Sequence, residues 1–220
     1  MKIRTVTRDG KDTSMADSPP YPRPCSTSSR GPEDLYSSRP PWDIGRPQPA
    51  FVVLADTGAI QGRVLDVGCG TGEHMLMSAG LGLDANGIDL ASTALRAAKE
   101  KARQRGRTAR FLLWDALKLA DLGESFDTVL GCGLFHVFNG YDRAAYVDSL
   151  RSAVQPGGRY FMLCFSDQQP GDWGPHRIAQ AEIKAAFAEG WRVDSIESST
   201  IDITTDPDGI RAWLVALTRI

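Results

Sequence analysis

The stretch VLDVGCGTG, residues 64–72, decides the fold of this 220-residue chain. Its apolar start carries one carboxylate, Asp66, and its end places a glycine at every second position. A buried strand that turns through glycines into a helix brings backbone N–H groups close to a ligand. Residues 62–68 therefore predict a strand, and residues 72–81 predict the helix that follows the turn.

Strand and helix patterns go on alternating along the rest of the chain. Further strands are predicted at residues 83–90, 109–117, 126–133, 159–166, 191–203 and 212–220. Helical spacing of apolar residues recurs around Leu95, Ala98 and Ala102, at 141–154 and at 180–190, and Ser92 or Thr93 could cap the first of these helices. Such alternation favours a doubly wound α/β fold with a mostly parallel seven-stranded sheet. Only a loop joins the last two strands, so the C-terminal strand should be antiparallel.

The N-terminal part has a different composition, with nine of the thirteen prolines before residue 51. Residues 1–35 are predicted to be a disordered extension, since they have too few apolar side chains to offset the entropy of ordering. Residues 36–59 are expected to form an ordered lid segment, and residues 60–220 the folded domain. The apolar anchors of the lid segment are Trp42, Ile44 and Phe51.

Charge, hydropathy and cysteine content limit the classes of partner and the cell compartment that are expected. The net charge of −2 gives no electrostatic reason to expect nucleic acid. No apolar run reaches the roughly 18 residues of a membrane span, and no secretory signal is recognisable. The four cysteines form no C-x-x-C pair, which favours a reducing cytoplasm without a disulfide framework or a metal site. A monomer or weak homodimer acting on a small molecule is expected.

The glycine spacing differs from that of dinucleotide-binding turns, which follow G-x-G-x-x-G. Gly68, Gly70 and Gly72 are spaced two and two, and Glu73 comes next. Asp66 and Glu73 around a pyrophosphate would place like charges together. A ligand with an amine and a sulfonium resolves this conflict, and S-adenosylmethionine (SAM) is such a ligand.

Two further carboxylates follow predicted strands. Asp89 ends the second strand, nineteen residues after Gly70, where it could accept hydrogen bonds from both ribose hydroxyls. Asp115 ends the third strand and could accept one from the adenine amino group. Leu90 and Ala116 would then flank the adenine ring with apolar surface.

Together these residues give a recognisable resemblance. Residues 60–165 resemble class I SAM-dependent methyltransferases, whose first motif has the form D-x-G-x-G-x-G, and QPGGRYFML (155–163) is similar to the usual turn into their fifth strand. The resemblance implies a Rossmann-like methyltransferase fold. The cofactor-binding residues are then Asp66, Gly68, Cys69, Gly70, Thr71, Gly72, Asp89, Leu90, Asp115, Ala116 and Cys132.

Two other phrases indicate a branch of that family. PPWDIG (40–45) and GLFHVF (133–138) resemble the small-molecule branch of thiopurine, thiol and halide methyltransferases. In that branch an N-terminal segment with a Trp-Asp pair lies over the cofactor, which implies cofactor contact for Trp42. The predicted substrate pocket consists of Tyr36, Leu134, Phe135 and Trp173.

His136 is the candidate general base, because it follows the fourth strand near the expected site of transfer. An unperturbed histidine titrates near pH 6.5 and could take a proton from a phenol, thiol or amine. The alternative is a half-buried histidine that donates a hydrogen bond to a backbone carbonyl. For His74, in the first helix, a packing or solvent role is expected.

The sequence thus predicts in-line transfer of the SAM methyl group to a small-molecule S, N, O or halide nucleophile. Two alternatives remain at this point. One is a NAD-type oxidoreductase on the same sheet, and the other is a non-catalytic SAM-binding regulator.

Overall fold

The computed structural model describes residues 31–220, which form one seven-stranded sheet flanked by helices. The strand order is β3-β2-β1-β4-β5-β7-β6, and β7 is antiparallel to both of its neighbours. The predicted fold class is therefore confirmed. The strands are β1 (Arg63–Val67), β2 (Asp84–Asp89), β3 (Arg110–Leu113), β4 (Phe126–Cys132), β5 (Val154–Phe165), β6 (Trp191–Ile201) and β7 (Ile210–Arg219).

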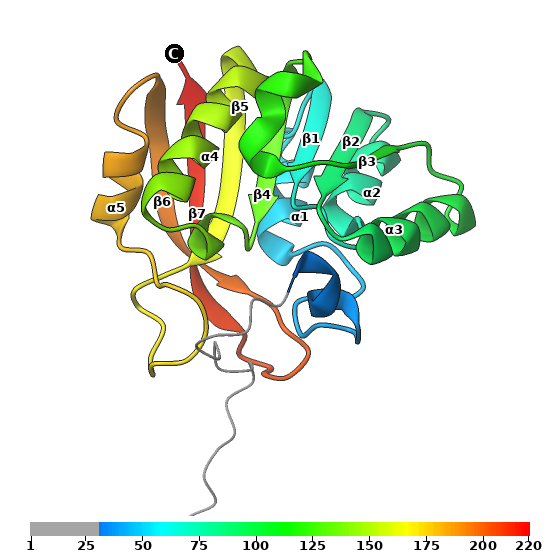
Figure 1. Ribbon diagram of the computed structural model, residues 1–220, viewed down its shortest axis with the longest axis horizontal. Helices are drawn as coiled ribbons and strands as arrows, with labels where there is room; N and C mark the ends of the chain where they lie inside the picture. The colour runs from blue at the N-terminus through cyan, green and yellow to red at the C-terminus, as the bar shows by residue number, and fades with distance from the viewer. Residues whose placement is uncertain (1–30) are drawn as a thin grey trace, which may run out of the picture.

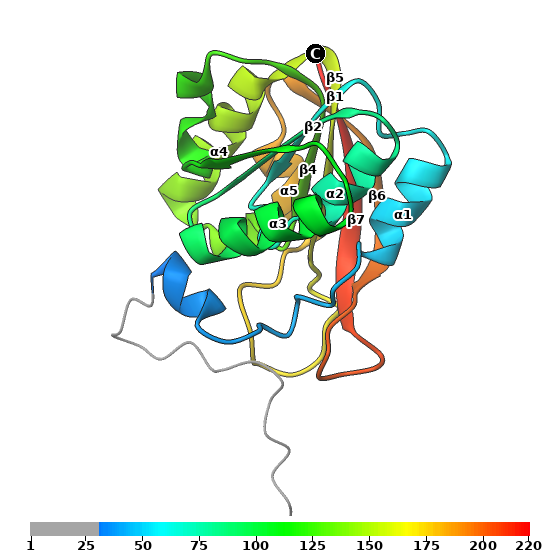
Figure 2. The ribbon, with the colours of Figure 1, turned by 90° about the vertical axis from the view of Figure 1, so that its right-hand side faces the viewer.

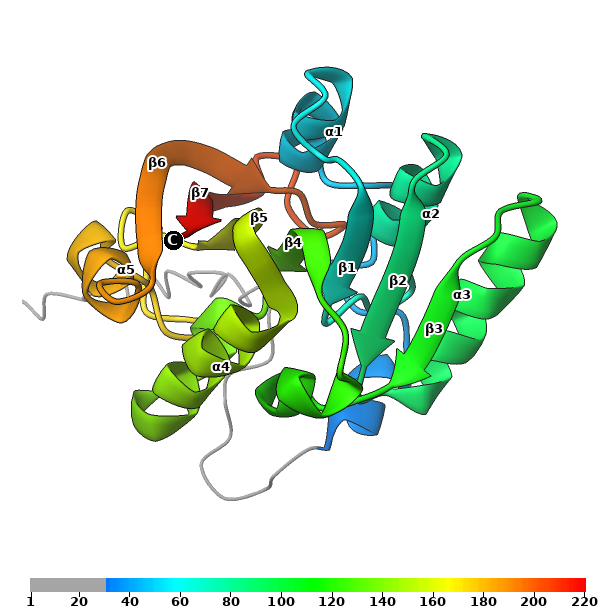
Figure 3. The same ribbon diagram turned by 90° about the horizontal axis from the view of Figure 1, so that it is seen from above.

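Helices cover both faces of the sheet, as the view along the strands shows (Figure 3). Helices α1 to α3 lie on one face, and α4 and α5 lie on the other. The α-helices are α1 (Pro49–Asp56), α2 (Glu73–Gly80), α3 (Ser92–Gln104), α4 (Gly140–Ala153) and α5 (Gln180–Ala186). Three 3-10 helices are η1 (Pro32–Tyr36), η2 (Ala116–Leu122) and η3 (Phe135–Val137).

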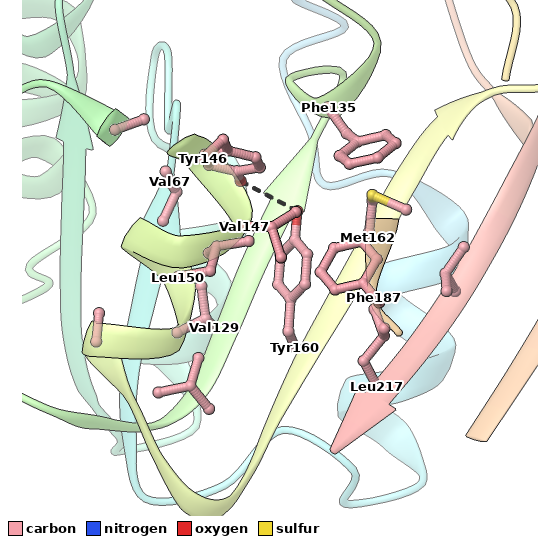
Figure 4. Close-up of a cluster of buried hydrophobic side chains, with 14 of the residues drawn as sticks. Val67, Val129, Phe135, Tyr146, Val147, Leu150, Tyr160, Met162, Phe187 and Leu217 are labelled. Atoms are coloured by element: carbon pink, nitrogen blue, oxygen red, sulfur yellow. Dashed lines mark hydrogen bonds between the residues drawn. The ribbon is translucent and has the colours of Figure 1, made fainter. Parts of the chain in front are cut away.

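Burial explains why the central strands read as continuous apolar runs. Val64, Leu65 and Val67 of β1 are each fully buried, because helices cover both sides of this strand. On the α4 side, Tyr146 and Tyr160 lie within the core with their hydroxyl oxygens 3.0 Å apart (Figure 4). The largest apolar cluster thus holds α4 and α5 against β4, β5 and β7.

Several element boundaries differ from the predictions, and β5 begins at Val154 rather than at residue 159. The third strand ends at Leu113 rather than at residue 117, because Asp115 caps η2 by accepting a hydrogen bond from the N–H of Leu117. The last helix ends at Ala186, four residues before its predicted end. No helix in residues 31–220 is long and apolar enough to cross a membrane.

The lid segment lies at the end of the sheet where β1, β2 and β4 finish (Figure 1, blue). It passes from η1, beside α3, across that end to α1 (Figure 2). The 3-10 helix η1 begins at Pro32, before the predicted start of the lid segment at residue 36, and the name lid segment refers from here on to residues 32–48. Residues 1–30 lie outside the described residues, so their disorder stays a prediction.

Candidate active site

A cavity of about 480 Å³ opens beneath the lid segment, at the carboxyl ends of the parallel strands. This is within the range typical of small-molecule sites. Most predicted site residues line it, although they come from distant parts of the chain. They are Tyr36, Trp42, Gly68, Cys69, Gly70, Thr71, Gly72, Asp89, Leu90, Asp115, Ala116, Cys132, Leu134 and His136.

The glycine turn forms one wall. Gly68, Gly70 and Gly72 take φ values of +72°, +52° and +85°, which side-chain-bearing residues rarely adopt. A Cβ atom at Gly72 would lie 2.9 Å from the Cβ of Ala98, so glycine there also lets α3 pack closely. The turn then leads directly into α2.

Asp89 braces this turn from the neighbouring strand. The parallel register that pairs Val67 with Ile88 sets Asp89 beside the glycines. Its Oδ2 accepts a hydrogen bond from the N–H of Gly70 and its Oδ1 one from the N–H of Ala91, each at 2.8 Å. Burial raises the pKa of this carboxyl, and the backbone donors act against that rise. Each oxygen keeps a second lone pair with which to accept from a ligand hydroxyl.

Asp66 lies beneath the turn rather than in the cavity wall. Its side chain is 1% exposed, and neither carboxylate oxygen has a hydrogen-bond partner among the described residues. Burial raises the pKa of Asp66 to about 7, and the charge of Asp89 adds to this effect. The nearest basic atom is Nδ1 of His74, 3.8 Å from Oδ2. An unpaired buried carboxylate close to the cavity favours a cationic ligand.

Glu73 does not bring the negative charge to the cavity that the sequence suggested. Its carboxylate forms ion pairs with Lys101 at 2.8 Å and with Arg105 at 2.7 Å. Lys101 also donates a hydrogen bond to Oγ1 of Thr71. These two cations offset the burial of Glu73, and its pKa is lowered. The electrostatic argument against a pyrophosphate therefore depends on Asp66 and Asp89, beside the glycine spacing.

The carboxyl end of β3 supplies a further wall of the cavity, for which the sequence predicted Asp115 but not Trp114. Asp115 borders the cavity, with Oδ1 engaged by the N–H of Leu117, while Oδ2 makes no hydrogen bond within the described residues. Trp114 lines the cavity beside it, and its indole N–H donates to the carbonyl of Lys118 at 2.9 Å. The signal for Trp114 was its place directly before Asp115 at a strand end.

His136 has a geometry that disfavours the predicted role as general base. Its Nδ1 accepts a hydrogen bond from the backbone N–H of Phe165 at 3.0 Å, so the neutral ring carries its proton on Nε2. Burial lowers the pKa of His136 to about 3, and Arg143 and His176 lower it further. The backbone-bonded histidine of the alternative interpretation is thus present, with a backbone N–H as donor in place of the expected carbonyl acceptor.

Two predicted substrate-pocket residues lie outside the cavity wall. Phe135 is fully buried and stacks on Phe187, because the tight turn of η3 directs it to the α5 side of the sheet. Trp173 packs edge-on against Phe165, with ring centroids 6.4 Å apart, and Phe165 is the one that faces the cavity. Side chains that were not among the predicted site residues complete the apolar wall: Ile44, Val137, Phe138, Phe165, Pro175 and Ile201.

Aromatic side chains of the lid segment cover the cavity. Tyr36 approaches the glycine turn so closely that a Cβ atom at Gly70 would lie 2.6 Å from its hydroxyl oxygen. Tyr36 also shares a side-chain hydrogen bond with Trp42, and burial raises the pKa of its phenol well above the usual value. Both aromatic residues therefore cover the site.

Comparison with known proteins identifies the class. A family described as a methyltransferase domain matches residues 64–158. A 2-heptyl-1-hydroxyquinolin-4(1H)-one methyltransferase of Mycobacteroides abscessus is 36% identical over 180 residues, covering 80% of this chain and 79% of that protein. The chain therefore belongs to the SAM-dependent methyltransferases of class I, as predicted, and the oxidoreductase and regulator alternatives are set aside.

Other similar proteins include further methyltransferases. A probable thiol methyltransferase of Arabidopsis thaliana is 26% identical over 166 residues, covering 74% of each chain. A solved structure described as the conversion of a disulfide bond into a thioacetal group during echinomycin biosynthesis is 40% identical, with a TM-score of 0.76 and coverage of 86% of this chain and 88% of that one. A magnesium protoporphyrin IX methyltransferase of Synechocystis with bound SAM, 20% identical with a TM-score of 0.61 and covering 78% of this chain and 76% of that one, shares the fold.

The site's residues fit SAM, the cofactor of this family. Asp89 has spare acceptor lone pairs for ribose hydroxyls, and Asp66 is a buried carboxylate without a partner among the described residues. The glycine turn borders the cavity. Trp114, Leu90 and Ala116 give apolar surface for an adenine ring. The chain is thus an enzyme that methylates small molecules and releases S-adenosylhomocysteine.

Proposed function

We propose that the methyl acceptor is a largely apolar molecule whose nucleophilic atom is already anionic when it reacts. The observation that carries this proposal is the hydrogen bond from the N–H of Phe165 to Nδ1 of His136. Nδ1 is occupied by this hydrogen bond, and Nε2 already carries the proton of the neutral ring. His136 therefore cannot remove a proton from the methyl acceptor without first losing the contact to Phe165.

Four other ionisable groups at the cavity are also unsuited to proton removal. Burial raises the pKa values of Cys132 and Tyr36 far above neutrality. Glu73 is held by two cations, and Asp89 by two backbone donors. An acceptor that ionises in water by itself needs no such base. A phenol of ordinary pKa or an ammonium would react slowly.

The walls support an apolar and partly planar acceptor. Trp114, Phe138 and Phe165 border the cavity together with Val137 and Pro175. The relative from Mycobacteroides abscessus is named for a hydroxyquinolone that carries a heptyl chain, and the relative from Arabidopsis for thiols. An aromatic N-hydroxyl and a thiol both give anions readily. The thiol and halide branch indicated by the sequence is thus part of this proposal.

Bound SAM supplies an electrophilic methyl group, which passes to the acceptor's lone pair as the positive charge on sulfur is lost. The chain's own contribution is to hold the acceptor in line, which is worth about 7–11 kcal/mol in well-oriented reactions. Tyr36 and Trp42 exclude water from above, so an anionic nucleophile is stripped of its hydration. The Nε2–H of His136 can orient an acceptor oxygen by donating to it.

The test is a panel of thiols and N-hydroxy heteroaromatics whose pKa values range over several units. For each acceptor, kcat/KM should rise tenfold per pH unit below the acceptor's own pKa and level off above it. His136→Asn keeps an acceptor for the N–H of Phe165 and should leave that inflection in place. An inflection at one fixed pH for every acceptor, which disappears in His136→Asn, would show that His136 is a base.

Cofactor binding gives a separate measurement. Asp89→Ala removes the proposed ribose acceptor and leaves the N–H of Gly70 without its partner. Calorimetry with S-adenosylhomocysteine should show binding about 10- to 100-fold weaker, as expected for the loss of hydrogen bonds to a charged group. Unchanged affinity would remove Asp89 from the proposed cofactor site.

A further inference from the structure

His74 is a largely buried ionisable side chain that the proposed methyl transfer does not use. It lies in the first turn of α2 and borders the cavity. Its Nε2 accepts a hydrogen bond from the backbone N–H of Gln48 at 3.2 Å. The neutral ring therefore carries its proton on Nδ1, which faces Oδ2 of Asp66 at 3.8 Å. The ring thus lies between the lid segment and the carboxylate under the glycine turn.

Gln48 is the point at which the end of the lid segment is fixed. It is only 3% exposed, and its side-chain amide exchanges two hydrogen bonds with the backbone of Asp202, at 3.0 and 2.8 Å. Arg46 adds an ion pair with the carboxylate of Asp202 at 2.7 Å. Separation of Gln48 from His74 therefore requires this end of the lid segment to leave the loop between β6 and β7.

The groups that face the imidazole come from four elements. Asp66 faces it from β1, and the edge of Phe51 from α1, with ring centroids 4.6 Å apart. Glu73 precedes it on α2, but Lys101 and Arg105 hold that carboxylate. The lid segment contributes the N–H of Gln48. Burial lowers the pKa of His74 to about 4, and the charge of Glu73 acts in the opposite direction.

We propose that His74 is a positioning residue that allows the lid segment to close only while its imidazole is neutral. A proton on Nε2 would turn the acceptor into a donor that faces the donor N–H of Gln48, so the contact would become repulsive. With the lid segment open, water reaches the ring and hydrates its protonated form, as it does for an accessible histidine. Closure therefore expels one proton. This inference does not depend on which acceptor the enzyme methylates.

The sign and size of the effect follow from the two protonation states. An accessible histidine has a pKa near 6.5, whereas that of His74 in the closed form is about 4. The closed form is fully favoured above pH 6.5, and it loses this advantage as the pH falls from 6.5 toward 4. Between pH 7.5 and 5.5 the closing equilibrium should fall about tenfold.

The experiment follows hydrogen exchange of the Gln48 amide in the full chain without ligand, corrected for the intrinsic effect of pH. Protection of this amide should be about tenfold lower at pH 5.5 than at pH 7.5, because exchange tracks the opened population. In His74→Gln the side-chain oxygen can still accept from Gln48 but does not ionise, so protection should be equal at both pH values.

Two control variants test whether something other than His74 causes the pH dependence of amide protection. Gln48→Ala keeps the backbone N–H and loses the contacts to Asp202, so its protection should be lower at both pH values with the same ratio. Asp66→Asn should also keep the ratio, because the titrating group is His74. The proposal is overturned if protection of the Gln48 amide does not change with pH in the parent protein. It is also overturned if the difference between the two pH values persists in His74→Gln or vanishes in Asp66→Asn. If circular dichroism shows that His74→Gln does not fold, the parent and the two control variants decide.

Discussion

At the scale of single residues, the conformation of Gly70 matters in a way that its motif alone does not show. The sequence predicted close approach of a ligand to the glycine turn. In the structure, the chain itself approaches just as closely, since a Cβ atom at Gly70 would lie 2.6 Å from the hydroxyl oxygen of Tyr36. This glycine therefore serves both the turn and the docking of the lid segment.

Gly70→Ala should weaken S-adenosylhomocysteine binding and expose the lid segment to chymotrypsin after Tyr36. Gly82→Ala is the matched control, because Gly82 has a φ of +79° and a Cβ atom there would have no neighbour within 4 Å. Both variants should lose about 1–2 kcal/mol of stability from the left-handed backbone. Equal ligand binding and equal cleavage in the two variants would contradict the contact with Tyr36.

At the scale of elements, helix α3 receives its N-terminal cap from the lid segment. Ser92 or Thr93 was the predicted cap, but the capping position is Ala91, whose side chain cannot accept a hydrogen bond. The carboxylate of Glu33, in η1, accepts from the N–H groups of Ser92 and Thr93 at 2.6 and 3.2 Å. The helix therefore depends on a residue some 60 positions away, and its exposed backbone donors hold the lid segment.

Glu33→Gln should loosen the lid segment. The hydrogen bonds at Ser92 and Thr93 lower the pKa of Glu33 from 4.5 to about 2, so its docking is complete above pH 4.5 and is lost as the pH falls toward 2. Faster chymotrypsin cleavage after Trp42 at pH 7 is the measurement. Glu189→Gln, at an exposed position beyond α5, is the control, and equal cleavage in both variants would argue against this cap.

At the scale of the whole molecule, a polar pair lies inside the apolar layer between α4 and the sheet. Tyr146 and Tyr160 are fully buried, and their hydroxyl groups hydrogen-bond to each other at 3.0 Å (Figure 4). A Cβ atom at Gly131 would lie 2.6 Å from the hydroxyl oxygen of Tyr160, so the neighbouring strand leaves room for it. The pair thus fixes α4 relative to β4 and β5.

Tyr146→Phe and Tyr160→Phe should each cost about 1–3 kcal/mol, because each leaves a buried hydroxyl without a partner. The double variant should cost clearly less than the sum, since both hydroxyls are then absent. Urea unfolding of the four proteins measures this coupling. Additive losses would show that each hydroxyl acts independently of the other.

The sequence by itself determined the sheet, the cofactor class and part of the cavity wall. Strand and helix periodicities are local, and the glycine turn, Asp89 and Asp115 each stand at a strand end that the chain pattern marks. Because parallel strands finish at one edge of the sheet, residues at those ends must meet there. Localisation in the cytoplasm and the oligomeric state stay predictions.

Only the tertiary structure decided the protonation and direction of individual side chains. The tautomer of His136 depends on the N–H of Phe165, and the neutralisation of Glu73 on Lys101 and Arg105. The tautomer of His74 depends on Gln48, which precedes it by 26 positions. Such properties arise from partners that are distant in sequence, and only folding brings those partners together.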